Sequence, residues 1–179
     1  ASDVYKRQIL LCSVFPYYAK AEELKLAESA QSAILIEAST GEVLFEKNVH
    51  EKKFPASMTK MMSMLIILES IDKGIIKWDE MVTVSANASS MGGSQILLET
   101  NEQMSVSDLF KGIAVASGND AVVALAEKIA GTEDMFVDMM NKRAQELGLT
   151  NTNFKNCHGL HDANHYSCLL YTSPSPRDR

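Results

Sequence analysis

The sequence predicts a mixed α/β fold, with an antiparallel sheet flanked by helices and an all-helical lobe. Residues 33–38 form a short apolar run, 39–42 read as a turn, and 43–46 are apolar again, which is the pattern of a β-hairpin. Residues 57–72 are apolar almost all round, so they predict a buried helix. No strand–helix–strand unit repeats along the chain, which favours an antiparallel sheet over a doubly wound one.

The second half of the chain is predicted to be mainly helical. Ser105 and Asp108 have the spacing of a capping box, with Asp in place of Glu. Gly131 and Gly148 follow apolar segments, as glycine does at helix C termini. The further expected elements are strands at 81–84 and 96–98, a loop at 89–94, helices at 105–116, 120–130 and 132–147, and a loop at 149–167.

The composition fits one globular domain. The 179 residues are 46% hydrophobic and 22% charged, which is ordinary for a protein with a packed core. The net charge is −6 and the basic residues do not gather in a stripe, so nucleic-acid binding is not expected. No apolar run approaches the about 18 residues that a membrane-spanning helix needs.

The N terminus has the pattern of an incomplete export signal. Lys6 and Arg7 precede an apolar stretch at 9–18, and residues 19–21 read Ala-Lys-Ala, a small-x-small cleavage site. We therefore predict a partial signal peptide at 1–21 and an extracytoplasmic location.

The predicted folded domain covers residues 22–167. Residues 1–8 and 168–179 have no periodicity that fits an element, and we interpret both ends as foreign to the fold. Once the signal is removed, Cys157 and Cys168 remain, and nothing in the sequence requires them to pair.

Ser57 and Lys60 are the first candidate site. Residues three apart share a helix face, so the hydroxyl and the amine are expected side by side at the start of the apolar helix. Burial and the positive end of the helix dipole both favour a neutral lysine, which can act as a base for the serine. Ser70 and Lys73 have the same spacing, but Lys73 lies in the last turn, where its charged form is favoured. A serine at a helix start followed by a solvated lysine is the simpler alternative.

Ser117 and Asn119 are the second candidate site. Together with Gly118 they interrupt an apolar helical stretch, so their polar groups must line a cleft or form an inter-helix turn. Ser85 and Asn87 repeat the serine-x-asparagine spacing but lie at a strand end, without a buried helical frame.

These segments, in this order, resemble the penicillin-binding proteins and serine β-lactamases, whose motifs are Ser-x-x-Lys, Ser-x-Asn and Lys-Thr-Gly. The resemblance is closest to the low-molecular-weight D-alanyl-D-alanine carboxypeptidases of the S11 peptidase family. It implies a transpeptidase-like fold. The segments that carry it, between about 30 and 167, are 33–44, 55–62, 92–94, 116–121 and 156–162.

The resemblance also implies roles. Ser57 would be the nucleophile, Lys60 its general base, Ser117 a proton relay to the leaving D-alanine, and Asn119 a ligand of the substrate peptide. The Ser57 N–H would donate to the oxyanion. The implied partners are the D-Ala-D-Ala end of peptidoglycan stem peptides and β-lactam antibiotics, with no cofactor, no metal and no nucleic acid. Membrane association would depend on a C-terminal region that this sequence does not contain.

One motif of that family is absent. Neither Lys-Thr-Gly nor Lys-Ser-Gly occurs in the sequence, although that strand would supply the second oxyanion donor and bind the substrate carboxylate. We therefore expect a truncated catalytic domain that lacks its C-terminal strands and is inactive alone.

Three alternatives remain open at this point. A class A β-lactamase would have Ser-Asp-Asn at 117–119 and a Glu-x-x-Leu-Asn segment, and the sequence has neither. His158, His161, Asp162 and His165 are zinc-type ligands, although Gly159 places them in a loop that does not preset their geometry. A non-catalytic wall-binding relative is the third alternative.

Overall fold

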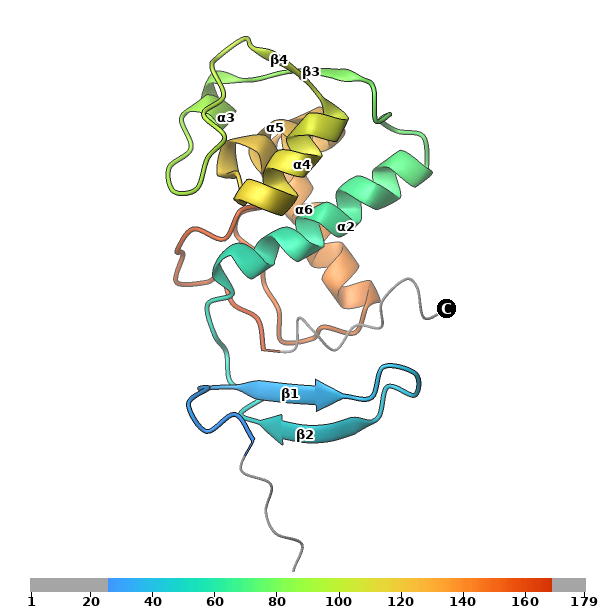
Figure 1. Cartoon of the computed structure of the whole chain (residues 1–179), viewed down its shortest axis with the longest axis vertical. Helices are drawn as coiled ribbons and strands as arrows, with labels where there is room; N and C mark the ends of the chain where they lie inside the picture. The colour runs from blue at the N-terminus through green and yellow to red at the C-terminus, as the bar shows by residue number, and fades with distance from the viewer. Residues whose placement is uncertain (1–25, 169–179) are drawn as a thin grey trace, which may run out of the picture. The chain divides into compact units, whose positions relative to one another are not determined.

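The computed structural model describes residues 26–168 (Figure 1). The predicted signal at 1–21, and all but the first residue of the tail at 168–179, lie outside the described residues. Residues 26–30 belong to a separate unit, in which the Ala30 N–H donates to the Ala27 carbonyl. The elements that follow are β1 (Ala33–Ile36), β2 (Val43–Lys47), the 3-10 turn η1 (Ala56–Met58), α2 (Thr59–Asp72), β3 (Met81–Thr83), α3 (Ala86–Ser89), β4 (Gln103–Ser105), α4 (Val106–Ala116), α5 (Asn119–Ala130) and α6 (Glu133–Glu146).

The predicted hairpin is confirmed. Strands β1 and β2 are antiparallel, with Leu35 opposite Phe45 and an irregular register directly after it. The turn between them is held by the Glu37 carboxylate, which accepts the N–H groups of Ser39 and Thr40 at 2.9 and 2.6 Å. Glycine is needed at Gly41, where φ is +74°.

The second sheet differs from the prediction. Strand β3 is present, but its antiparallel partner is β4, and the predicted strand at 96–98 is wrong. The Ile96 and Leu98 N–H groups instead donate to the buried Asp120 carboxylate, at 3.0–3.1 Å. Residues 96–98 therefore do not form a strand, although they are apolar. The Asp120 carboxylate accepts the N–H groups that a strand would donate to a neighbouring strand.

The predicted helices of the second half are confirmed, with ends that shift by at most one residue. The Ser105 hydroxyl caps α4 by accepting the Asp108 N–H at 3.1 Å, and Thr132 caps α6 by accepting the Met135 N–H at 3.2 Å. Helix α3 was not predicted. It occupies the segment just before the expected loop and is capped by Ser85, which accepts the Ala88 N–H.

Helix α5 lies at the centre of the hydrophobic core. Its residues from Ala121 to Ala126 are at most 2% exposed, and it contacts α2, α3, α4 and α6 (Figure 1). Helix α2 packs Met62, Ile66 and Ile67 into the same core. The expectation that α2 is buried all round is only partly met, because Met61 and Leu68 on its other side are 43% and 38% exposed. The longest helices have 14 residues, so no helix in the described part could cross a bilayer.

Candidate active site

Ser57 and Lys60 lie side by side, as their spacing predicts. The Lys60 Nζ is 3.3 Å from the Ser57 Oγ, and Lys60 is only 3% exposed, whereas Ser57 itself is exposed. The serine lies in η1 and not in the α-helix proper, directly after Ala56, whose φ is +49°. The contact therefore spans the junction of η1 and α2, where residues three apart still lie on one side of the turn.

The Lys60 amine has a second partner from far along the chain. Its Nζ donates to the His158 carbonyl at 2.9 Å. Burial lowers the pKa of Lys60 below its usual range and outweighs the nearby Cys157, which acts in the opposite direction. A neutral amine has two protons and one lone pair. With one proton held by the His158 carbonyl, the lone pair can accept the Ser57 hydroxyl proton, which is what a general base requires.

The segment around His158 was noted in the sequence only as part of a motif and a possible metal loop. Here its backbone packs on the start of α2. The Cys157 carbonyl accepts the buried Ser63 hydroxyl at 2.6 Å. Gly159 has a φ of +94°, and a Cβ at this position would overlap the Ala56 carbonyl, next to the serine. Only glycine lets the two segments approach so closely.

The three histidines do not form a metal site. The His165 Nδ1 accepts the Lys155 N–H at 3.1 Å, so its Nε2 carries the proton that it shares with the Thr59 hydroxyl, 2.8 Å away. The His161 ring packs edge-on against Phe54, with ring centroids 4.6 Å apart. Within residues 26–168, no group of three or more histidine, cysteine or carboxylate side chains could hold a metal ion.

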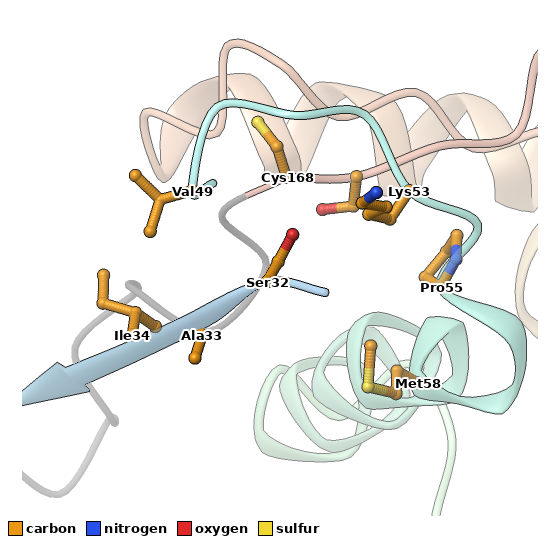
Figure 2. A pocket seen from close by; sticks show the side chains of 9 residues that line it. Ser32, Ala33, Ile34, Val49, Lys53, Pro55, Met58 and Cys168 are labelled. Carbon is orange, nitrogen blue, oxygen red and sulfur yellow. The ribbon is translucent and has the colours of Figure 1, made fainter. Parts of the chain in front are cut away.

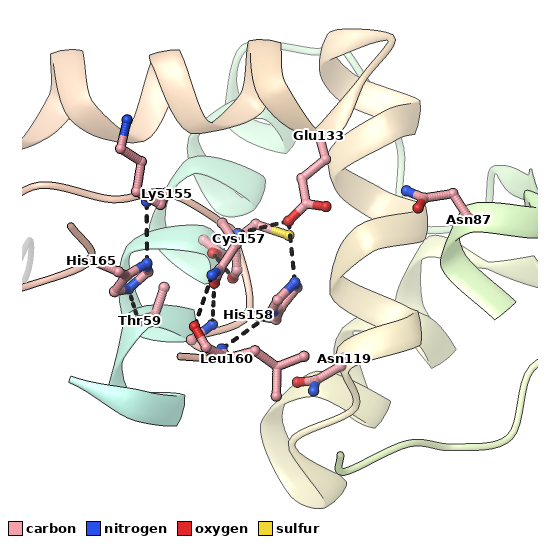
Figure 3. Close-up of polar contacts among 12 residues, drawn as sticks. Thr59, Asn87, Asn119, Glu133, Lys155, Cys157, His158, Leu160 and His165 are labelled. Carbon is pink, nitrogen blue, oxygen red and sulfur yellow. Dashed lines mark hydrogen bonds and ion pairs between the residues drawn. The ribbon is translucent and has the colours of Figure 1, made fainter. Parts of the chain in front are cut away.

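Asn119 is held by a third segment, and within the described residues no hydrogen bond joins its side chain to Ser57 or Lys60. Its side-chain Nδ2 donates to the Gly92 carbonyl at 2.6 Å, and its N–H donates to the Ser94 carbonyl at 2.7 Å. A Cβ on Gly93 would lie 2.8 Å from the Asn119 Nδ2 and 3.5 Å from the Leu160 side chain. The 92–94 loop, the start of α5 and the residues after His158 therefore meet. Figure 3 shows Asn119 beside Leu160.

Ser117 is a predicted site residue whose side chain forms no hydrogen bond with the other three in the described part of the chain. It caps α4 in the left-handed conformation, with a φ of +57°. Among the residues that the structure describes, no hydrogen bond joins its hydroxyl to Ser57 or Lys60. The sequence analysis assigned no role to Asp120, three residues further on. Its carboxylate accepts backbone N–H groups of the 96–98 segment and fixes that segment beside this turn.

The repeated spacings are explained by structural roles. The Ser70 hydroxyl donates to the Ile66 carbonyl at 2.7 Å, and Lys73 is an exposed partner of Glu69. The Asn87 side chain donates to Glu127 at 2.9 Å and lies apart from Cys157 and His158 (Figure 3). The expected difference in burial is confirmed, because Lys60 is 3% exposed and the Lys73 side chain is 66% exposed.

A hollow of about 420 Å³ lies beside β1 and is lined by, among others, Ser32, Val49, Met58 and Cys168 (Figure 2). None of the predicted site residues lines it, although Met58 is the neighbour of Ser57. We therefore place the candidate chemistry at the Ser57–Lys60 pair and not in this hollow.

Residues 19–171 match the family model described as D-alanyl-D-alanine carboxypeptidase. The chain is 58% identical over 143 residues to D-alanyl-D-alanine carboxypeptidase DacF of Bacillus subtilis, covering 80% of this chain and 37% of that protein. It is 42% identical over 137 residues to DacC of Escherichia coli, covering 73% and 34%.

Solved structures give the same result. The carboxypeptidase DacD of Francisella tularensis superimposes with a TM-score of 0.77 at 38% identity, over 80% of this chain and 35% of that one. Penicillin-binding protein 5 of Haemophilus influenzae gives 0.76 at 41% identity, over 80% and 42%. The chain thus spans about a third to two-fifths of the length of these relatives, and its predicted fold class is confirmed.

A first prediction concerns Gly159. Gly159→Ala should lower the free energy of unfolding by about 3 kcal/mol, because it adds both left-handed strain and overlap with the Ala56 carbonyl. Gly148→Ala is the matched control, since Gly148 has a φ of +74° but open space around it. The control should lose only about 1 kcal/mol in urea denaturation. Equal losses in the two variants would show that the close approach at Gly159 is not real.

A second prediction follows from the lowered pKa of Lys60. Above this pKa and below 10.5, the folded chain has released the Lys60 proton while the unfolded chain still holds it. The contribution of Lys60 to the free energy of unfolding should therefore rise with pH across that window. Lys60→Met lacks this contribution, so the wild-type stability minus the variant stability should increase from neutral pH to about pH 10. A difference that does not change with pH contradicts the prediction.

Proposed function

The chain belongs to the D-alanyl-D-alanine carboxypeptidase family, and we propose that it carries the nucleophile and base of a serine-type enzyme that removes the terminal D-alanine from peptidoglycan stem peptides. The observation that carries the proposal is the buried Lys60 amine, 3.3 Å from the exposed Ser57 hydroxyl and 2.9 Å from the His158 carbonyl. The identity shared with carboxypeptidases from several bacteria supports the same reaction.

In the proposed reaction, the Ser57 Oγ attacks the carbonyl carbon of the penultimate D-alanine while its proton passes to Lys60. The Ser57 N–H donates to the oxyanion that forms. The bond to the leaving nitrogen then breaks, and the amine of the departing D-alanine takes a proton by way of Ser117. Water hydrolyses the serine ester, and Asn119 holds the substrate peptide during both steps.

β-Lactams are proposed to acylate the same serine. Penicillin-binding protein D2 of Listeria monocytogenes, which is 27% identical with a TM-score of 0.69, was solved in its ampicillin-bound form. Stem peptides lie outside the cytoplasm, so we propose that the chain acts there, and the export pattern at Lys6 and Arg7 is consistent with this. Ser-Gly-Asn at 117–119 supports a carboxypeptidase over a class A β-lactamase.

The third prediction tests whether acylation requires Ser57 and Lys60. In a chain extended to the length of its curated relatives, fluorescent penicillin should label the protein, and Ser57→Ala should abolish the label. Lys60→Ala should slow labelling by about 10² to 10⁴-fold, because the serine loses its base. Ser70→Ala is the control and should label at the wild-type rate. An extended protein that neither labels nor releases D-alanine from a D-Ala-D-Ala peptide would overturn the proposed function.

The 179-residue chain itself should not be acylated. It has no Lys-Thr-Gly motif, so half of the oxyanion hole and the carboxylate-binding residues are not in this sequence. After incubation with benzylpenicillin, its intact mass should be unchanged. An added mass equal to one penicillin would show that the described residues suffice for acylation.

A further inference from the structure

The carboxylate of Glu133 lies beside Cys157 and the His158 ring (Figure 3). Glu133 is the first residue of α6, and its side chain is 18% exposed. Its Oε1 accepts the Cys157 N–H at 3.0 Å and lies 3.4 Å from the His158 Nε2. One carboxylate oxygen thus contacts the backbone of one residue and the ring of the next.

The His158 ring has a fixed tautomer. Its Nδ1 accepts the Leu160 N–H at 3.1 Å, so in the neutral ring the proton lies on Nε2, which faces Glu133. Burial lowers the pKa of His158 more strongly than the Glu133 carboxylate raises it, which favours this neutral form. Glu133 therefore accepts the Cys157 N–H and has the same oxygen 3.4 Å from the His158 Nε2, so it contacts both residues of the 157–158 segment.

The backbone carbonyl groups of the same two residues face α2. The Cys157 carbonyl accepts from the Ser63 hydroxyl, and the His158 carbonyl accepts from Lys60. A shift of the segment away from α2 would take the acceptor from the Lys60 amine. The amine would then be free to rotate, and its lone pair would no longer be directed at the Ser57 Oγ.

We propose that Glu133 is a positioning residue for Lys60: by holding the Cys157 N–H and the His158 ring, it keeps the His158 carbonyl against the lysine amine. The negative charge of Glu133 does not help Lys60 act as a base, because a nearby negative charge favours the ammonium form of a lysine. The role needs an oxygen acceptor at this place, which glutamine also supplies. The catalytic consequence rests on the proposed function, whereas the positioning itself does not.

The groups that face Lys60 limit how a test can be designed. They are the Ser57 hydroxyl in η1, and the Cys157 thiol and His158 on the loop, with Glu133 beside these two. Glu133→Gln and Glu133→Ala both remove the charge, but only glutamine keeps an acceptor. Any difference between these two variants therefore reports the position of the segment and not the local charge.

The experiment measures how fast acetic anhydride acetylates Lys60 in the 179-residue chain, by peptide mass spectrometry at one pH. Exposed Lys73 is the internal reference, and Asp134→Ala, also in the first turn of α6, controls for lost charge there. We expect acetylation of Lys60 to rise at least tenfold in Glu133→Ala, and to stay within about twofold of wild type in Glu133→Gln and Asp134→Ala. Equal rates in the alanine and glutamine variants would overturn the proposal.

A second measurement needs no variant and covers the case in which Glu133→Ala does not fold. Two-bond ¹H–¹⁵N NMR spectra of the wild-type chain identify which ring nitrogen of His158 carries the proton. A proton on Nε2 supports the proposal, and a proton on Nδ1 overturns it. Neither readout requires penicillin or substrate, so a failure here leaves the proposed function standing, and the reverse also holds.

Discussion

The local structure of the candidate site depends on the burial of one amine. Lys60 is 3% exposed, and a charged ammonium in such a place is costly unless it is paired. No carboxylate forms an ion pair with it in the described part of the chain. The protein instead offers two oxygen partners, the Ser57 hydroxyl and the His158 carbonyl. This arrangement satisfies a neutral amine better than a charged one, so the need to bury the lysine and the chemistry proposed for it point the same way.

The surrounding elements are arranged so that these partners stay in place. The His158 carbonyl can reach α2 because Gly159 allows its segment to lie directly against Ala56. The buried His165 ties the following residues to Thr59, the neighbour of Lys60. On the other side, Asn119 and the 92–94 loop are fixed to each other by two hydrogen bonds. The 157–165 segment is thus held at the start of α2, and the 92–94 loop meets Asn119 and Leu160 beside it.

Local rules predicted the parts of this structure that local interactions determine. The Ser57–Lys60 contact, the Ser105 and Thr132 caps and the hairpin all depend on residues within a few positions of each other, and all are confirmed. The 96–98 strand failed because a long-range partner, Asp120, took its backbone donors. The contact of Lys60 with His158 spans 98 residues, so no spacing rule could reveal it. The resemblance to the family included the His158 segment, but no local rule explained why this segment matters. No sequence pattern indicated that Glu133 contacts it.

The central claim is that Lys60 can serve as a base because the folded chain disfavours its charged form. NMR titration of the lysine side-chain ¹³Cε signals tests this directly, with the Lys60 signal assigned by its loss in Lys60→Arg. The account predicts that the Lys60 midpoint lies below the ordinary lysine value of 10.5, while that of exposed Lys73 serves as the reference. A Lys60 midpoint at or above that of Lys73 would contradict the account.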